Sequence, residues 1–369
     1  GDHVVMKNGF DVLGGYEPTF TAPRNPDPAT NATSVRFFGP VVEWNGGVTA
    51  TLDGFKLLAD IIEPLPSTHA SVTISGSAGA TLLGVRIEPF VPAKVYASKT
   101  YGILITGGTG GSTVIGPLSQ VLAAKGTKSV GLGVVVDASP AAITIGGAIL
   151  GNSGTQSFGV EHLGLGNLTI TGGSVTAGAG TTSATGVLVG RTGYGTTQLT
   201  NATIHGGAAK TARGVDHRIA QALLVNGGLI SGGGVADNAT VVHGLLTEAV
   251  DQVSIKNTKV VGCDVAAGTT PATSRAIDLR NTAVAVLTGA SIEGATVDGG
   301  TLAEELTGIR TQGVPLTVKA STVTATSGKF GNTNRGIHIT GSFVPGTIVT
   351  LTENNAIDGG TAAGLGPLF

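Results

Sequence analysis

The chain has 369 residues, of which 61 are glycine and only 12% are charged. Glycine at about one residue in six, against a usual share of roughly 7%, excludes a mainly helical protein, because each glycine inside a helix costs roughly 0.5–1 kcal/mol relative to alanine. Hydrophobic residues at 41% and a mean hydropathy of +0.31 exclude a disordered chain. A net charge of −2 gives no electrostatic reason to expect nucleic acid or an anionic membrane as a partner. A glycine-punctuated all-β protein with a long core is the class that remains.

Residues 1–34 differ from the rest of the chain and are predicted to form an N-terminal cap. Aromatic residues concentrate there, among them Phe10, Tyr16 and Phe20, and 23–33 reads as a proline-fixed loop. Such a cap would shield the first turn of a repeating structure, because an open sheet edge invites pairing with other chains. The sequence therefore predicts two parts, a cap with a proline-rich loop at 1–34 and a repeat domain at 35–369.

The repeat begins imperfectly near Val35 and becomes regular after Tyr101. In the regular part, a glycine is followed by an apolar residue and then by alternating residues. The opening positions are Gly102, Gly133, Gly159, Gly186, Gly214, Gly244, Ala276, Gly308 and Gly336. They lie 26 to 32 residues apart, a period that is typical of a solenoid.

The second half of each repeat carries two apolar residues five positions apart. These pairs are Ile145 and Leu150, Ile170 and Val175, Leu199 and Ile204, Val225 and Ile230, Ile255 and Val260, Leu287 and Ile292, and Val318 and Val323. Between them lie Gly147, Gly172, Asn201, Gly227, Asn257, Gly289 and Ala320. Glycine and asparagine accept a positive φ, so a sharp bend between two short strands is expected in every repeat. Two or three strands joined by bends, with no helical period, predict one coil of a parallel β-helix.

Stacked coils of this kind would be held together by continuous apolar columns. Each coil pairs its backbone with the next at about 4.8 Å, and each buried apolar side chain contributes about 1.5–3 kcal/mol. The residues directly after the opening positions would form one such column, namely Ile103, Val134, Val160, Val187, Val215, Leu245, Ile277, Ile309 and Ile337. The expected fold is a right-handed parallel β-helix of roughly eleven coils.

The repeated unit resembles the right-handed parallel β-helix proteins of the pectate-lyase-like class. Within that class, the segments 14–20 (GGYEPTF) and 52–57 (LDGFKL) are similar to repeat-containing surface proteins of bacteria. The resemblance implies a secreted or cell-surface location. It does not fix the function, because the class contains polysaccharide lyases and hydrolases as well as adhesins, phage tailspikes and structural proteins.

Any function is expected on the outward face of the coils, where charged residues gather. Side chains alternate along a strand, so the second and fourth residues after each opening position share this face. The second positions are Leu104, Val135, Glu161, Leu188, Asp216, Leu246, Asp278, Arg310 and His338. The fourth positions are Thr106, Asp137, Leu163, Gly190, Arg218, Glu248, Arg280, Gln312 and Thr340.

Two functions are compatible with this face. Asp216 and Asp278 lie two coils apart, hence roughly 9–10 Å, near the upper end of the ~6.5–9.5 Å that separates the carboxyl groups of inverting glycosidases. These aspartates are the candidate catalytic residues of a polysaccharide lyase or glycoside hydrolase. The candidate ligand-binding residues are Arg218, Glu248, Arg280, Arg310 and His338. Arginines could hold the carboxylates of an acidic sugar, and paired carboxylates could alternatively hold Ca2+. The other interpretation is a solvated face on which aspartates and arginines pair across coils, each pair contributing 0–1 kcal/mol.

Other residues that could carry chemistry are predicted to be structural. His162 and His217 fall at the third position and should point inward. The sole cysteine, Cys263, reads as a small apolar filler. No metalloprotease, P-loop or nucleophile-elbow motif is present. Threonine-rich runs do not recur at a fixed position in each coil, which disfavours an ice-binding surface.

The sequence therefore predicts a non-enzymatic structural or adhesive β-helix protein. A lyase or hydrolase acting on acidic polysaccharide is the alternative. We expect no resident cofactor, no metal other than a possible Ca2+, no transmembrane segment and no nucleic-acid partner. The last ten residues, 360–369, are glycine-rich and apolar, with no polar cap, so end-to-end stacking of copies into a filament is also expected.

Overall fold

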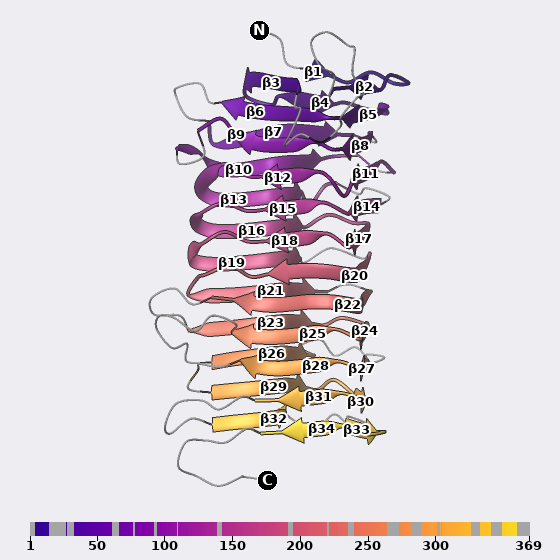
Figure 1. The fold of residues 1–369 in the computed structure, drawn as a ribbon, viewed down its shortest axis with the longest axis vertical. Coiled ribbons are helices and arrows are strands. Elements are labelled where there is room, and N and C mark those ends of the chain that lie inside the picture. The colour runs from indigo at the N-terminus through magenta and orange to yellow at the C-terminus, as the bar shows by residue number, and fades with distance from the viewer. Residues whose placement is uncertain are drawn as a thin grey trace. The chain divides into compact units, whose positions relative to one another are not determined.

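The structure is a computed structural model, and the chain divides into two compact units. Unit 1 is Gly1–Gly178 and unit 2 is Ala179–Phe369. The described residues are 4–14, 27, 33–60, 66–76, 78–91, 94–108, 110–138, 142–190, 195–219, 221–234, 240–263, 273–281, 289–300, 303, 305–325, 333–340 and 349–359. Every element they form is a β-strand (Figure 1).

Unit 1 consists of three stacks of parallel strands, and each turn of the chain adds one strand to each stack. The first stack contains β1 (Val4–Val5), β4 (Val42–Trp44), β7 (Thr68–Ser75), β10 (Val95–Thr106), β13 (Lys125–Val134) and β16 (Gly154–His162). The second contains β2 (Val12–Leu13), β5 (Thr49–Asp53), β8 (Gly79–Leu83), β11 (Ser112–Ile115), β14 (Ala142–Ile145) and β17 (Asn167–Thr171). The third contains β3 (Thr33–Phe38), β6 (Phe55–Asp60), β9 (Arg86–Pro89), β12 (Gln120–Leu122), β15 (Ala148–Leu150) and β18 (Ser174–Thr176).

Unit 2 repeats this plan, except that single long strands serve the second and third sides of its first two turns. Its first stack contains β19 (Gly180–Val189), β21 (Thr211–Arg218), β23 (Val241–Glu248), β26 (Thr273–Arg280), β29 (Glu305–Gln312) and β32 (Thr333–Thr340). The long strands are β20 (Thr196–His205) and β22 (Ala222–Gly233). They are followed on the second side by β24 (Gln252–Lys256), β27 (Gly289–Glu293), β30 (Leu316–Lys319) and β33 (Val349–Thr352). The third side continues with β25 (Lys259–Cys263), β28 (Thr296–Gly300), β31 (Thr322–Thr324) and β34 (Ala356–Asp358).

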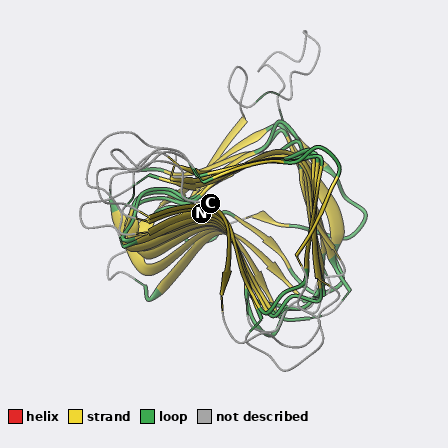
Figure 2. Cartoon of the chain, turned by 90° about the horizontal axis from the view of Figure 1, so that it is seen from below, coloured by secondary structure: helices red, strands yellow, loops and turns green. Residues whose placement is uncertain are grey.

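The expected all-β fold is confirmed as a parallel β-solenoid. The strands of each turn follow three sides around an apolar interior (Figure 2). The number of turns differs slightly from the roughly eleven expected. Within the described ranges, no helix is long and apolar enough to cross a bilayer.

The predicted apolar column is confirmed in unit 2. Backbone pairing places Val187, Val215, Leu245, Ile277, Ile309 and Ile337 next to one another in successive turns. All of them are fully buried except Ile337 in the last turn, which is half-buried. The glycine-anchored register is therefore correct for this unit.

The predicted register was wrong for one turn of unit 1. Ile103 pairs with Leu132, and Leu132 pairs with Val160, so the opening glycine of this turn is Gly131 and not Gly133. A Cβ on Gly131 would lie 2.7 Å from the backbone oxygen of Gly159. Gly133 is needed for a different reason, since a Cβ there would lie 2.5 Å from the ring of Tyr101. As a result Gly133 replaces Val135 at the second position, and exposed Asp137 lies in a turn outside the sheet.

The sharp bends between paired apolar residues are mostly where the sequence predicts them. Positive φ occurs at Gly172, Asn201, Gly227, Asn257 and Ala320.

Two of the predicted pairs were misplaced. In the pair predicted as Ile145 and Leu150, the second buried residue is Ile149, and Leu150 is exposed. Ile292 pairs with Ile255 and Val297 with Val260, so the bend of that turn is Gly294, with φ 61°, and not Gly289. The residue predicted to precede Ile292, Leu287, lies outside the described residues.

Charged side chains form one exposed ladder beside these bends in unit 2. Lys256 contacts Glu293 at 3.3 Å, Glu293 contacts Lys319 at 3.3 Å, and Lys319 contacts Glu353 at 3.4 Å. Hydrogen bonds from Lys319 and Lys256 lower the pKa of Glu293. The sign of the charge thus alternates from each turn to the next.

Part of the predicted cap region forms strands. β1 and β2 pair in parallel with β4 and β5, and Phe10 is 68% exposed. Tyr16 and Phe20 lie outside the described residues, so the cap stays a prediction. Behind these strands Trp44 is fully buried, and its indole nitrogen donates to the Ala50 carbonyl oxygen at 3.4 Å.

Candidate functional site

The candidate site lies on the outer side of a bend in the first stack of unit 2. Arg213 and Asp216 are three residues apart in β21, yet their side chains meet at 3.2 Å. Strict alternation would place them on opposite faces. They meet because Gly214 and Val215 both face inward: a Cβ on Gly214 would lie 2.5 Å from two backbone oxygen atoms, and Val215 is fully buried. The bend turns the flanking side chains toward each other on the outside.

The bend adds a third outward column, which strict alternation along the strand does not predict. The residue before each opening position shares the outer face with the second and fourth positions. In unit 2 these residues are Thr185, Arg213, His243, Arg275, Thr307 and Arg335. The sequence does contain a sign of this third column, because an arginine lies three residues before each of Asp216, Asp278 and His338.

The stacking of the predicted site residues is as expected in unit 2. Asp216, Leu246, Asp278, Arg310 and His338 occupy neighbouring turns in the second column. Arg218, Glu248, Arg280, Gln312 and Thr340 do so in the fourth. Asp216 and Asp278 are two turns apart, with buried Leu246 between them.

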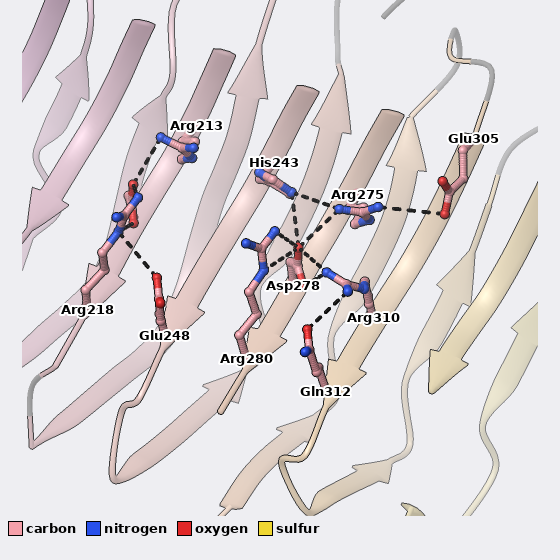
Figure 3. A network of polar contacts seen from close by, with 11 residues as sticks. Arg213, Arg218, His243, Glu248, Arg275, Asp278, Arg280, Glu305, Arg310 and Gln312 are labelled. Carbon is pink, nitrogen blue, oxygen red and sulfur yellow. Dashed lines mark hydrogen bonds and ion pairs between the residues drawn. The ribbon is translucent and has the colours of Figure 1, made fainter. Parts of the chain in front are cut away.

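Asp278 is at the centre of the site and has no exposed surface. Its Oδ2 accepts hydrogen bonds from Arg280 Nη2 at 2.7 Å and from Arg275 Nη1 at 3.3 Å, and it lies 3.2 Å from His243 Nε2 (Figure 3). Arg310, from the next turn, donates to both carboxylate oxygens at 3.3 Å. Burial alone would raise the pKa of Asp278, but the hydrogen bonds from His243 and Arg280 outweigh it and hold the pKa well below its ordinary value.

His243 is buried beside Asp278 and is neutral at pH 7. Burial lowers its pKa to about 4, against the opposing effect of the Asp278 carboxylate. A neutral imidazole that donates from Nε2 fits the contact to Asp278. The guanidinium groups therefore provide the positive charge around this carboxylate.

Asp216 is held in a second, smaller cluster. Arg218 binds it through two parallel hydrogen bonds of 2.7 Å, and Arg213 approaches at 3.2 Å. Asp216 is only 1% exposed, and Arg218 also lies 4.0 Å from Glu248. The pairing between aspartates and arginines that the sequence suggested is thus present, largely within single strands rather than only across turns.

The last turns extend the network. Arg310 donates to Gln312 Oε1 at 3.1 Å, and Glu305 lies 3.8 Å from Arg275 and 3.3 Å from Arg335. Arg335 also donates to the Nδ1 of His338 at 3.4 Å. Burial, followed by the charge of Arg335, lowers the pKa of His338. An uncharged His338 accepts this hydrogen bond.

The network carries more positive than negative charge. We call its cationic residues the arginine face, and they are Arg213, Arg218, Arg275, Arg280, Arg310 and Arg335. The paired acids are Asp216, Glu248, Asp278 and Glu305. Six cations against four acids leave a local charge of about +2 in a chain whose net charge is −2.

The equivalent face of unit 1 has a different chemistry. Its third outward column carries Tyr101, Val130 and Phe158, which are almost fully buried. Glu161 binds Lys128 Nζ at 2.6 Å, and Lys128 lies 5.3 Å from the centre of the Phe158 ring. Burial, with a smaller effect of Glu161, raises the pKa of Tyr101 to about 12. The charged site is thus a property of unit 2.

The predictions for the remaining candidates are confirmed in part. His217 is fully buried and lies 2.9 Å from Thr197 Oγ1, His162 is 1% exposed, and Cys263 is buried. The expectation about threonine was wrong in unit 1, where Thr51, Thr81, Thr144 and Thr169 occupy one column, interrupted by Val114. The adjacent column carries Thr49, Gly79, Ser112, Ala142 and Asn167. It is chemically mixed, so no two-dimensional threonine array results.

The arrangement disfavours the predicted alternatives that need free carboxylates. Arginine side chains occupy both oxygens of Asp216 and of Asp278. A Ca2+ ion there would be repelled by the same guanidinium groups. Among the residues that the structure describes, no three histidine, cysteine, aspartate or glutamate side chains come together in a group that could hold a metal ion.

No protein-family model matches the chain, and searches of the curated proteins and of the solved structures return no match. The parallel β-solenoid is therefore established by the structure. The right hand of its coils, the pectate-lyase-like resemblance and the bacterial surface type remain predictions.

Proposed function

We propose that this protein is a non-enzymatic structural or adhesive β-solenoid, secreted or displayed at a cell surface, whose arginine face binds acidic polysaccharide. The observation that supports a non-enzymatic role is the complete pairing of Asp278 with arginines on its own and neighbouring strands. A hydrolase needs a carboxylic acid with a raised pKa as proton donor. The pKa of Asp278 is shifted in the opposite direction.

The excess of positive charge supports an anionic ligand. The side chains of the arginine face are between 14% and 38% exposed, so they retain donors that the internal acids do not use. Guanidinium groups bind carboxylates and sulfates through two parallel hydrogen bonds. Turns about 4.8 Å apart present these groups in rows along which an extended acidic chain could lie.

Binding is tested with a polyuronate, a sulfated polysaccharide and a neutral glucan, each measured by calorimetry at low and at physiological salt. We expect binding of the acidic polymers only, weakened by salt. Arg218→Gln with Arg280→Gln should reduce affinity on the order of tenfold or more, because a hydrogen bond to a charged group contributes about 1.5–3 kcal/mol. Arg86→Gln is the control, since Arg86, which is 38% exposed against 30% for Arg218 and 29% for Arg280, pairs with Glu88 in unit 1.

The same incubations test the enzymatic alternative. New reducing ends or unsaturated sugar products formed by the wild-type protein, and lost in Asp216→Asn/Asp278→Asn, would establish a hydrolase or lyase instead. Equal binding of the neutral glucan would contradict the role given to the arginine face.

A second proposal, end-to-end assembly of copies, is supported by the apolar residues exposed in the terminal turns. Ile339, Leu351 and Ile357 are 42%, 52% and 38% exposed in the last described turn of unit 2. In the first described turn of unit 1, Val5 and Leu13 are 47% and 48% exposed. Light scattering over a range of concentrations tests the assembly, and a constant monomer mass would contradict it.

A further inference from the structure

The net charge of the strands that form the arginine face alternates from one turn to the next. β21 and β26 each carry two arginines and one buried aspartate, so each of these strands is positive. On β23, which lies between them, the one ionised residue is Glu248, because burial lowers the pKa of His243 to about 4. On β29 Glu305 offsets Arg310, and on β32 Arg335 restores a positive charge. Positive turns are thus separated by turns that are negative or neutral.

The same alternation occurs within single columns of side chains, both in the column of fourth positions and in the third outward column (Figure 3). One residue that is not a cation separates the arginines of each column, namely Glu248 between Arg218 and Arg280, and His243 between Arg213 and Arg275. Because one turn rises by about 4.8 Å, successive arginines of a column are ~9.6 Å apart. The face therefore presents its guanidinium groups in rows with a period of two turns.

Glu248 interrupts one of these rows at the surface. Its side chain is 30% exposed, and those of Arg218 and Arg280 on either side are 30% and 29% exposed. A carboxylate of a bound polymer that reached this turn would lie beside a like charge, which is unfavourable. A neutral sugar in the same place would meet no such repulsion.

We propose that the arginine face selects polysaccharides in which an acidic sugar alternates with a neutral sugar, and that Glu248 determines this specificity. The proposal rests on the binding of acidic polysaccharide proposed above and specifies the chemistry of the polymer. One sugar of an extended chain is about as long as the rise of one turn, ~4.8 Å, so a chain that lies along the stack places successive sugars on successive turns. The acidic sugars then lie over β21 and β26, and the neutral sugar between them lies over β23.

Charge density alone predicts the opposite preference. A uniformly cationic surface binds a linear polyanion more tightly as more of its anionic groups are neutralised and more counterions are released. A polymer with a carboxylate on every sugar would therefore bind more tightly than one with a carboxylate on every second sugar. On the arginine face, however, the additional carboxylates would lie over the negative turn of β23 and the neutral turn of β29. A comparison of two such polymers therefore separates the effect of spacing from the effect of charge density.

The probes are oligosaccharides of equal length from hyaluronan and from polygalacturonate. In hyaluronan, glucuronate alternates with N-acetylglucosamine, whereas every sugar of polygalacturonate carries a carboxylate. Affinities are measured by calorimetry at neutral pH and physiological salt. We expect the wild-type protein to bind the hyaluronan oligosaccharide about fivefold more tightly, which is the effect of one like-charge contact at roughly 4 Å in water.

Glu248→Gln removes the negative charge between the two arginines and keeps the shape of the side chain. The variant should bind polygalacturonate about fivefold more tightly than the wild type does, with a smaller gain for hyaluronan, so that the preference is lost. Glu293→Gln is the control, because it removes the same charge from a side chain that is 37% exposed but lies on β27, in the second stack. It should leave the preference unchanged.

The outcomes separate this specificity from the binding itself. A preference for hyaluronan that is lost in Glu248→Gln and kept in Glu293→Gln supports the alternating ligand. Equal or tighter binding of polygalacturonate by the wild-type protein overturns the alternating ligand and leaves the binding of acidic polysaccharide standing. The same conclusion follows if both variants keep the preference, or if only the sulfated polysaccharide binds. Failure of all the acidic polymers to bind overturns both proposals.

Discussion

Several corner residues hold backbone conformations that ordinary side chains avoid. Ile219, Ala249 and Ala320 have φ values of 48°, 53° and 46°, in the left-handed region that costs a non-glycine residue about 1–2 kcal/mol. Ile219 is a β-branched residue that is 48% exposed, so little packing compensates the strain. Its backbone N–H donates to the Glu248 carbonyl oxygen at 2.9 Å, which anchors the corner to the next turn.

Replacing Ile219 by asparagine should stabilise the protein. Asparagine tolerates positive φ and keeps the backbone hydrogen bond, so we expect the free energy of unfolding to increase by about 1 kcal/mol. Chemical denaturation of Ile219→Asn measures the change. Ile339→Asn, which replaces a similarly exposed isoleucine within a strand, is the control and should give no gain. A lower stability of Ile219→Asn would show that the side chain matters more than the strain.

Three buried histidines make stability depend on pH. Burial lowers the pKa of His69, His162 and His243 to about 4, from an ordinary value of 6.5. Between these values the unfolded chain binds protons that the native protein does not, so stability rises with pH. Their contribution is fully present above pH 6.5 and is lost as pH falls toward 4.

His162→Leu tests this dependence. Each histidine should add about 1.4 kcal/mol per pH unit to the slope of the unfolding free energy within the window. We expect the variant to lose one such contribution, measured by urea denaturation at several pH values from 4.5 to 7.5. An unchanged slope would mean that His162 becomes protonated in the folded protein.

At the scale of elements, the sequence was sufficient for the period and for most of the apolar column and the corner positions, because glycine and alternation mark them directly. It was insufficient where two glycines stand two residues apart. Gly131 and Gly133 fit the alternating pattern equally well, and only the positions of Gly159 and the Tyr101 ring distinguish them. Strict alternation also does not predict the bend. As a result, the positions of Arg213 and Arg275 at the site could not be predicted from the sequence.

The bend depends on the lack of a side chain at the opening glycine. Gly214→Ala would bring a Cβ within 2.5 Å of the backbone oxygens of Gly244 and Ser231, so we expect a loss of about 1–3 kcal/mol in stability. It should also weaken binding of acidic polysaccharide, because Arg213 and Asp216 would separate. At Gly146 the nearest atom would be Pro117 Cγ at 3.4 Å, so Gly146→Ala should be nearly neutral in thermal melts. Equal effects of the two substitutions would argue against the bend as the cause.

At the scale of the whole molecule, the two units share one architecture and differ in what their outer faces carry. At the position before the opening glycine, unit 1 carries Tyr101 and Phe158, whereas unit 2 carries Arg213 and Arg275. The backbone hydrogen bonds between turns do not depend on these outward residues, so the face can change without a change of fold. The location of the site in unit 2 therefore follows from its side chains and not from the solenoid itself.

The alternating ladder of Lys256, Glu293, Lys319 and Glu353 limits how such a solenoid can grow by gene duplication. Inserting or deleting a single turn within the ladder would place two lysines or two glutamates side by side, and like charges in that position repel. Duplicating two consecutive turns preserves the alternation. Lengthening of this segment in steps of two turns is therefore electrostatically favoured over lengthening by one turn. A single column of surface residues thus influences which changes in the number of repeats are tolerated.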